Sequence, residues 1–191
     1  RSMATGGQVI ELAEGFVEGG QVQAGEVLVR LNDADARSAL GRTEADVTDA
    51  MAEVEEADRA LLLITDELEA ARDQADLRSR ALERQLDLKE RGVGTAAAVE
   101  TAELAASSAA QAVLSRRSAV DQAKARRAQA QTRLARAELA LQDASRRWKD
   151  TVLTSEFSGT LSTISLVKGG LVSPNEKIGS LIDPETLEVA F

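Results

Sequence analysis

The sequence contains no histidine and no cysteine. Without imidazole or thiolate side chains, a Ser-His-Asp triad, a cysteine nucleophile and a zinc finger are all excluded. Catalysis by carboxylates alone is still conceivable, but no pattern of Asp and Glu marks a reaction. We therefore expect no enzymatic activity, no metal site and no cofactor. The lack of cysteine fits the cytosol and the bacterial periplasm equally well.

Aromatic residues make up 2% of the 191 residues, which is too few for the core of an ordinary thick globular domain. No stretch approaches the roughly 20 apolar residues that a membrane-spanning helix needs, and no signal-peptide pattern opens the chain. The formal net charge of −9 argues against a nucleic-acid partner, because binding along a phosphate backbone relies on an excess of Lys and Arg.

The two ends of the sequence resemble cut ends. The first three residues, RSM, look like a remnant of cloning, and the last residues, LEVAF, read as the start of a strand. We therefore expect a piece of a longer protein, in which residues 184–191 begin a further, truncated β-domain. For the same reason, the absence of a targeting segment is uninformative.

The middle of the sequence is rich in Ala, Leu, Glu and Arg, a composition typical of coiled coils and long helical hairpins. Helices are predicted at about 34–91 and 96–149, with Asn32, Asp33 and Asp35 as candidate N-cap and first-turn residues.

Both runs show an a/d heptad pattern with small residues at d, which predicts close helix packing. The seam of the first run is Leu40, Val47, Val54, Leu61, Leu68, Ala75 and Leu82, with Thr43, Ala50, Ala57, Ile64 and Ala71 three positions later. The seam of the second run is Val99, Ala106, Val113, Val120, Leu134, Leu141 and Trp148, with Ala102, Ala109, Ala123, Ala130, Ala137 and Ala144.

Residues 92–95 separate the two runs and are too few for a parallel return, so the helices form an antiparallel hairpin. At 1.5 Å per residue, each arm is roughly 80 to 90 Å long. Gly92 and Gly94 supply the positive φ angles that a tight turn needs, and Thr95 is a candidate N-cap for the second helix.

Three arginines, Arg78, Arg116 and Arg127, interrupt the apolar seam. They either control the register and extend to the edge of the seam, or contact a neighbouring protomer.

The segments on either side of the hairpin, 6–33 and 151–183, are both rich in glycine and β-branched residues and predict short strands joined by tight turns. Aligning the two segments matches Gly19-Gly20 with Gly169-Gly170 and matches the valines that follow them. We interpret this as a pseudo-repeat, two halves of one β-domain with the hairpin inserted between them. Because each half has too few strands to bury a face, the halves should pair with each other.

This order of parts resembles the periplasmic adaptor, or membrane fusion protein, family of tripartite efflux pumps, including RND-type pumps, and of type I secretion systems. The residues that carry the resemblance are EGGQVQAGEVLVRLND (18–33) and TSEFSGTLSTISLVKGGLVSPNEKIGSLID (154–183), which look like the two halves of a lipoyl motif. The resemblance implies an α+β fold: a long antiparallel α-helical coiled-coil hairpin (34–150) inserted between two halves of a small lipoyl/biotinyl-like β-domain. It also implies no lipoyl modification, since the turn that carries the lysine in true carriers is replaced by the hairpin.

Many adaptors of this family carry, at the hairpin tip, an arginine, a leucine four residues later and a serine seven residues after that. Arg84, Leu88 and Thr95 have this spacing, with threonine in place of serine. The resemblance implies that these three residues dock onto a TolC-like outer-membrane channel. It further implies an inner-membrane transporter of RND or ABC type as a partner, a homo-oligomer such as a hexamer, and a location in the periplasm of a Gram-negative bacterium with the full-length protein anchored to the inner membrane.

Two alternatives stay open. The chain is also compatible with a structural coiled-coil scaffold that has no channel partner, in which Thr95 is merely a helix cap. An acyl or biotinyl carrier would need a lysine on an exposed β-turn, and Lys168, before Gly169-Gly170, is the candidate.

Overall fold

The computed structural model of the chain describes residues 3–182, which form two compact units. The first unit combines the residues up to Val47 with those from Ala137 onward, and the second is Thr48–Arg136. The boundaries of these units fall within both helices. The predicted domains 6–33, 34–150 and 151–183 instead separate the helical segment from the strand segments, and this division stays a prediction. The predicted start of a further β-domain at 184–191 lies outside the described residues.

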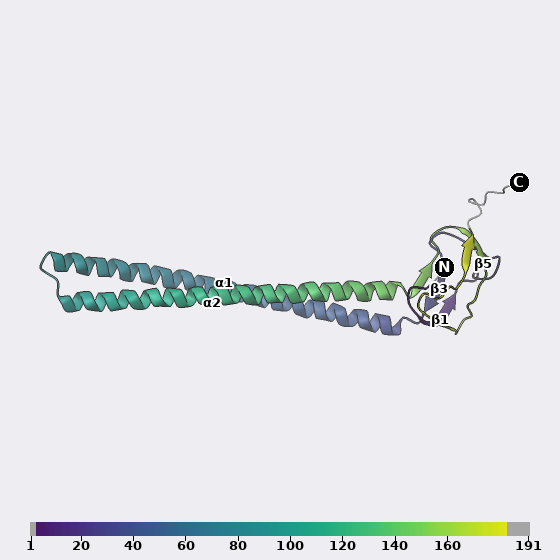
Figure 1. Cartoon of the computed structure of the whole chain (residues 1–191), viewed down its shortest axis with the longest axis horizontal. Helices are drawn as coiled ribbons and strands as arrows, with labels where there is room; N and C mark the ends of the chain where they lie inside the picture. The colour runs from purple at the N-terminus through teal and green to yellow at the C-terminus, as the bar shows by residue number, and fades with distance from the viewer. Residues whose placement is uncertain (1–2, 183–191) are drawn as a thin grey trace. The chain divides into compact units, whose positions relative to one another are not determined.

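The two helices are α1 (Ala34–Glu90) and α2 (Ala96–Lys149), shown in Figure 1. Helix α1 begins where the Asn32 side chain accepts a hydrogen bond from the Ala34 N–H at 3.1 Å, and Asp35 places a negative charge in the first turn. Helix α2 ends with Arg146, Arg147 and Lys149, whose positive charges are favourable near the C-terminal carbonyl groups.

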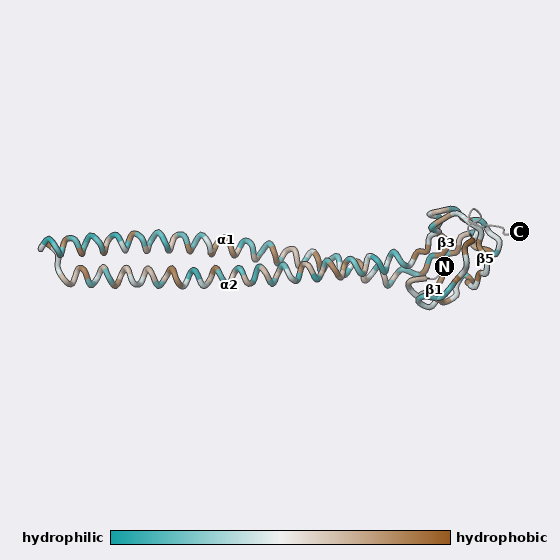
Figure 2. Tube along the Cα trace, turned by 45° about the horizontal axis from the view of Figure 1, so that its top comes forward, coloured by the Kyte–Doolittle hydropathy of each residue, from teal (hydrophilic) through white to brown (hydrophobic). Residues whose placement is uncertain are grey.

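In the second unit, α1 and α2 lie side by side and antiparallel (Figures 1 and 2). Along both helices, hydrophobic positions recur between hydrophilic ones, as Figure 2 shows. The predicted seam residues of this unit are buried or half-buried, while the three seam arginines are exposed. The most buried seam side chains in this unit are Ala50, Leu68, Val99, Val120, Ala123 and Ala130. The heptad pattern therefore located the helix-helix contact correctly.

Ion pairs across the seam connect the two helices at three levels. Arg133 pairs with Glu53 at 2.8 Å, and Arg116 pairs with Glu67 at 2.8 Å. The third pair joins Arg127 and Asp58. Exposed pairs of this kind contribute only about 0.2 to 1 kcal/mol each, so their main effect is to favour one register.

The charges of the two helices are unequal. Acidic side chains outnumber basic ones two to one in α1, and basic side chains outnumber acidic ones two to one in α2. Of the three seam arginines, Arg116 and Arg127 thus reach acidic partners on α1, as the register interpretation predicts. Arg78 makes no ion pair with any residue in the range 3–182.

Among the described residues of the first unit, seven short strands form two sheets. The strands are β1 (Gly7–Leu12), β2 (Gln21–Val22), β3 (Val27–Leu31), β4 (Val152–Thr154), β5 (Gly159–Ser162), β6 (Leu171–Val172) and β7 (Ser180–Ile182). One sheet has the order β4-β3-β1-β6 and the other β2-β5-β7. Because β3 pairs with β4, β1 with β6 and β2 with β5, both sheets contain strands from before and after the hairpin. The two halves therefore pair with each other, as the sequence predicts.

Hydrogen bonds around the two glycine pairs confirm the pseudo-repeat. The Gly19 N–H donates to the Leu161 carbonyl at 2.8 Å, and the Gly169 N–H donates to the Val9 carbonyl at 2.9 Å. Both glycines have left-handed backbone conformations, with φ of 82° and 85°. The turn of the first half therefore lies against β5, and the turn of the second half lies against β1, so that the two halves have equivalent contacts.

The same correspondence holds at a second pair of turns. The Glu26 carboxylate accepts a hydrogen bond from the Gln23 N–H at 2.9 Å, and the Glu176 carboxylate accepts one from the Ser173 N–H at 2.7 Å. These carboxylates close equivalent turns in the two halves, which the alignment of glycines and valines did not reveal.

A single apolar core lies between the strands of the two halves. Its buried side chains are Met3, Val9, Phe16, Val22, Leu28, Val29, Leu31, Leu161, Val172 and Ile178. Met3 is one of the most buried of these side chains, at 1% exposed. The Met3 carbonyl also accepts a hydrogen bond from the Asn175 N–H at 2.7 Å, so this residue is part of the β-domain.

Replacing a core residue should destabilise the first unit, whereas replacing an exposed one should not. We expect Leu28→Ala to cost about 2 to 4 kcal/mol, because Leu28 is 1% exposed, and Leu171→Ala, at 82% exposed, to cost less than about 0.5 kcal/mol. Trp148 is the only tryptophan and donates a hydrogen bond to Asp33 within this unit. Its fluorescence during urea unfolding measures the difference; equal midpoints for the two variants would contradict the assigned core.

Candidate hairpin-tip binding site

The C-terminus of α1 ends in a Schellman motif, which closes the hairpin turn. The Val93 N–H donates to the Leu88 carbonyl at 3.0 Å, and the Gly92 N–H donates to the Lys89 carbonyl at 3.0 Å. Gly92 has a φ of 78°, the left-handed conformation that this motif requires and that glycine adopts without strain. The turn is therefore specified by backbone hydrogen bonds.

Gly94 is required for a different reason from the one predicted. It does not have a left-handed φ, so the expectation of a positive φ is wrong for this residue. Its N–H donates to the Leu88 carbonyl at 2.9 Å, and a Cβ atom at this position would lie 2.7 Å from the backbone nitrogen of Lys89. The chain passes too close to the end of α1 for any side chain.

Helix α2 begins with Thr95 as its N-cap. The Thr95 hydroxyl accepts a hydrogen bond from the Ala98 N–H at 3.1 Å, which satisfies one of the free donors of the first turn. The hydroxyl hydrogen of Thr95 can still donate to a partner outside the chain. Thr95 is thus the N-cap that the sequence predicts, and this role leaves its hydroxyl able to bind another molecule.

Leu88 and Arg84 present an apolar group and a cation next to this turn. Leu88 is 39% exposed, and Arg84, four residues earlier, lies on the same face of α1. Asp87 pairs with Arg91 at 2.8 Å, and Arg84 makes no ion pair with any residue that the structure describes. The guanidinium group of Arg84 is therefore available to an acceptor on another molecule.

The structure brings Leu88 and Thr95 to one turn, because the Leu88 carbonyl binds the N–H of Gly94, the residue before Thr95. Sequence reasoning missed Val93, which is 73% exposed and lies between the two tip glycines. Val93 lies in a turn that is too short to cover its side chain, and this position is the feature of the sequence that would have indicated an exposed apolar residue. Leu86, 43% exposed, adds further apolar surface at the end of α1.

Three kinds of exposed group lie at the tip. A cation, exposed apolar side chains and a hydroxyl suit the carbonyl or carboxylate groups and apolar residues of another helical tip. In residues 3–182, no group of His, Cys, Asp and Glu side chains is arranged to hold a metal ion. No helix within this range has the length and apolar character needed to span a membrane. Lys168 is exposed in the turn that Gly169 closes.

Comparison with known proteins gives matches among solved structures, whereas no family model and no curated protein matches the sequence. The periplasmic adaptor protein EmrA matches with a TM-score of 0.50 and 16% identity, over 97% of this chain and 71% of that one. MacA from Actinobacillus actinomycetemcomitans matches with a TM-score of 0.53 and 18% identity, over 94% of this chain and 46% of that one. The soluble domain of LipC, a membrane fusion protein of a type I secretion system, matches with a TM-score of 0.52 and 14% identity, over 96% of this chain and 98% of that one.

At these identities the likeness shows the fold. The chain has the fold of periplasmic adaptor, or membrane fusion, proteins: an α-helical hairpin inserted between two halves of a lipoyl-like β-domain, as the sequence predicts. It spans less than half of the MacA chain but nearly all of the LipC soluble domain.

Alanine substitution at the two tip glycines should have the opposite effect on stability from alanine substitution at Gly41, which lies within α1. We expect Gly94→Ala and Gly92→Ala to lower the stability of the hairpin by about 1 kcal/mol or more, through the close backbone approach and the left-handed φ respectively. Gly41→Ala, where no atom lies within 4 Å of the added Cβ, should raise helix stability by up to about 1 kcal/mol. Thermal unfolding followed by circular dichroism compares the three; a Gly94→Ala variant as stable as Gly41→Ala would contradict the described turn.

Proposed function

We propose that this chain belongs to the periplasmic adaptor subunit of a tripartite export machine. Its hairpin tip docks onto a TolC-like outer-membrane channel, and the complete subunit links that channel to an inner-membrane transporter of RND or ABC type. The adaptor fold supports this proposal, and the observation that carries it is the tip: Leu88 is exposed beside an Arg84 that has no ion-pair partner among residues 3–182. The subunit makes and breaks no covalent bond.

Docking through the tip fits the physical properties of the three proposed residues. Leu88 buries apolar surface on contact, Arg84 provides a charge-assisted hydrogen bond, and the Thr95 hydroxyl donates at the start of α2. The Schellman motif and the Thr95 cap hold the turn in one conformation, so little entropy is lost on binding. A rigid small patch of this kind gains avidity when several copies bind one channel together.

The fold also supports the remaining parts of the proposal. EmrA is a periplasmic adaptor and LipC a membrane fusion protein of a type I secretion system, which supports a periplasmic location in a Gram-negative bacterium and attachment of the full-length protein to the inner membrane. Several copies, six in the arrangement implied by the resemblance, would surround a path for the exported substrate.

Charge at Leu88 should abolish docking without unfolding the hairpin, because an exposed tip residue contributes little to a seam of this length. Arg84→Ala should weaken docking less, since a single exposed charge pair is worth about 1 kcal/mol or less. Thr95→Asp should remove docking while keeping the helix cap, because Asp caps helices as well as Thr does. Export in a strain that lacks its own adaptor, complemented with full-length variants, measures each effect.

Leu77→Asp is the matched control for Leu88→Asp. Leu77 is 60% exposed on the same helix but lies about three turns from the tip, so its substitution should leave export unchanged. Circular dichroism should show equal helicity for both variants. Normal export by all three tip variants would favour the coiled-coil scaffold without a channel partner, and loss of helicity in Leu88→Asp would contradict the separation of docking from folding.

The carrier alternative requires covalent modification of Lys168, which lies on an exposed turn. We expect the protein to keep its unmodified mass after co-expression with a biotinyl or lipoyl ligase, since nothing besides the exposed lysine favours recognition. Intact mass spectrometry measures this, with Lys168→Arg as the control. An adduct that disappears in Lys168→Arg would establish the carrier function instead.

A further inference from the structure

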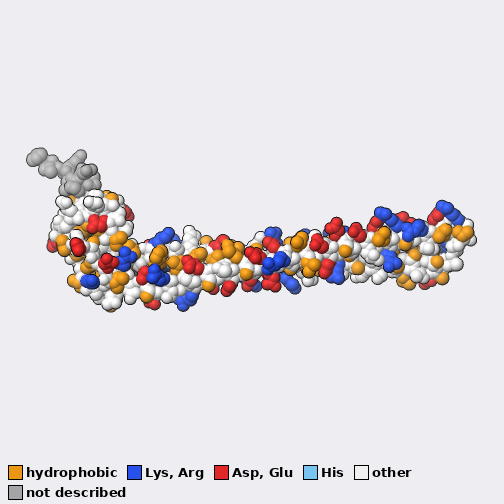
Figure 3. Space-filling model, turned by 180° about the vertical axis from the view of Figure 1, so that it is seen from behind, with side chains coloured by type: hydrophobic (Ala, Val, Ile, Leu, Met, Phe, Trp, Pro, Cys, Tyr) orange, Lys and Arg blue, Asp and Glu red, His pale blue; other side chains and the backbone are white. Residues whose placement is uncertain are grey.

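Val93 is the most exposed of the large apolar residues at the hairpin tip. It is 73% exposed, compared with 43% for Leu86 and 39% for Leu88. Its neighbours in the chain, Gly92 and Gly94, have no side chains that could cover it. Figure 3 shows hydrophobic side chains beside basic ones at this end of the hairpin. Val93 is therefore an apolar projection between two stretches of bare backbone.

The Schellman motif places Val93 next to Leu88, since the Val93 N–H donates to the Leu88 carbonyl at 3.0 Å. Side chains at these two positions of the motif commonly pack on each other, which by itself would give Val93 a purely structural role. Because Val93 is nevertheless 73% exposed, such a contact leaves most of its apolar surface uncovered. The two residues thus present neighbouring apolar surfaces at the turn.

The backbone around Val93 has free hydrogen-bond acceptors. The carbonyl groups of Gly92 and Val93 accept no hydrogen bond from any residue in the range 3–182. No atom lies within 4 Å of the place that a Cβ atom of Gly92 would take, so a donor from another molecule can approach here. A partner that covers Val93 also covers these carbonyls, and it must offer N–H or O–H groups to them.

The Val93 side chain has little freedom to lose on binding. Valine is branched at Cβ and has a single side-chain torsion with few allowed rotamers. The N–H groups of Val93 and Gly94 both donate to the Leu88 carbonyl, which fixes the backbone on both sides of the side chain. Ordering this residue in a complex therefore costs little conformational entropy, so burial of its apolar surface favours binding almost fully.

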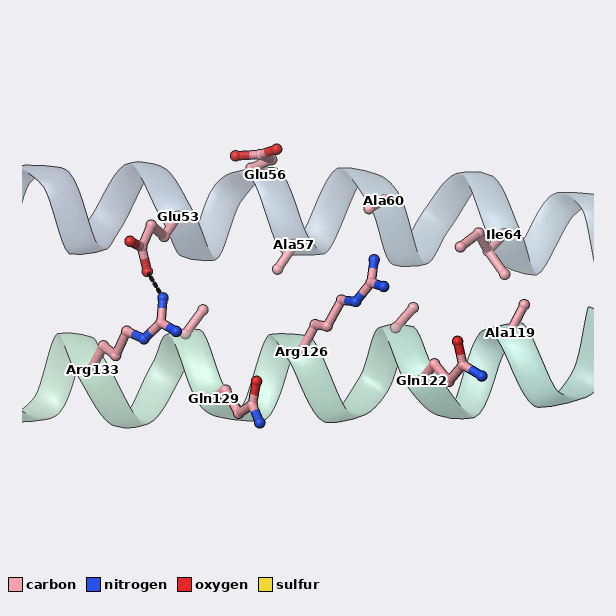
Figure 4. A pocket seen from close by; sticks show the side chains of 12 residues that line it. Glu53, Glu56, Ala57, Ala60, Ile64, Ala119, Gln122, Arg126, Gln129 and Arg133 are labelled. Carbon is pink, nitrogen blue, oxygen red and sulfur yellow. Dashed lines mark hydrogen bonds and ion pairs between the residues drawn. The ribbon is translucent and has the colours of Figure 1, made fainter.

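A projection needs a depression to receive it, and the groove of the hairpin itself is unsuitable. This groove lies between α1 and α2 (Figure 4), has a volume of about 400 Å³ and is lined by none of the tip residues. Arg126 extends from α2 toward α1 between Ala57 and Ala60, and Glu53 pairs with Arg133 at 2.8 Å. Because charged side chains of both signs line the groove, the depression that suits an uncharged valine lies on a different molecule.

We propose that Val93 is a further docking residue, which enters a depression between two helix ends at the tip of the TolC-like channel. This inference rests on the proposed function and adds to it the residue with the most exposed apolar side chain of the tip. The start of a helix forms one side of the depression, since its first N–H groups are free to donate to the Gly92 and Val93 carbonyls. Small apolar residues line the depression, because only they let the bare backbone of Gly92 and Gly94 come into contact.

Substitutions of different size and polarity at Val93 test this inference. We expect Val93→Ala to lower the affinity of the full-length protein for the purified TolC-like channel of the same bacterium by about tenfold or more, because two methyl groups lose their burial. Val93→Thr has nearly the same shape and should also weaken binding, since a hydroxyl replaces a buried methyl group. Val93→Ile should keep the affinity within about threefold, because it stays apolar and branched at Cβ. Surface plasmon resonance with the channel in lipid nanodiscs measures the affinities.

A photo-crosslink identifies the surface that Val93 contacts. The protein has no native cysteine, so Val93→Cys and Leu77→Cys can each be labelled with a cysteine-reactive benzophenone. Leu77 is the control, because it is 60% exposed on the same hairpin but lies about three turns from the tip. We expect the label at position 93 to react with the ends of two neighbouring helices of the channel, as mapped by mass spectrometry, and the label at position 77 to give no such product. Products elsewhere on the channel, or none in a complex that has formed, would overturn the proposal.

The outcomes separate this inference from the proposed function. If Val93→Ala binds like the wild type while Leu88→Asp does not bind, the inference is wrong and docking through the tip stands. If Leu88→Asp and all Val93 variants bind like the wild type, docking through the tip is wrong as well. Thermal unfolding followed by circular dichroism should be the same for the wild type and the Val93 variants, and a fall in stability that accompanies the loss of affinity would show that Val93 acts through the turn instead.

Discussion

The antiparallel pairing of β3 with β4 is the constraint on which the rest of the structure depends. Arg30 is opposite Val152, and the Leu31 N–H donates to the Thr151 carbonyl at 2.8 Å, so the chain leaves for the hairpin and returns from it at adjacent points. The indole N–H of Trp148 donates to Asp33 at 3.2 Å and continues this contact to the end of α2. Because these ends are held together, the entropy cost of closing the long inserted segment is met at the base of the hairpin. The two heptad seams then start in register.

Beyond its base, the hairpin is held by many weak contributions. Its seam is mostly alanine, with leucine and valine in similar numbers, and each cross-seam ion pair is exposed and worth little by itself. A helix of this length packed along a partner gains stability from repetition of such contacts. The surface residues and the tip are consequently free to vary without loss of the fold, which is what allows Leu88 to stay exposed.

Sequence reasoning was most successful where periodicity or glycine positions carry the information. The heptads located the seam, and the turn at 92–95 was found from its two glycines. Gly94 was misassigned because a close approach between backbones leaves no signal beyond the absence of a side chain. The burial of Met3 was not predicted, because its contact with the second half of the β-domain depends on pairing across the hairpin, which no local pattern shows.

The unequal charges of α1 and α2 are partly matched within the hairpin. Part of the acidic excess of α1 is neutralised within the hairpin, where Glu53, Asp58 and Glu67 receive arginines from α2. Other acidic residues of α1 pair along the same helix, as Glu55 does with Arg59 at 3.9 Å, or, like Glu69, make no ion pair with any residue in the range 3–182. The hairpin therefore keeps an exposed acidic excess on α1 after its internal ion pairs have formed. A patch as small as the proposed Arg84, Leu88 and Thr95 gains most when it binds a partner as one of several copies rather than alone.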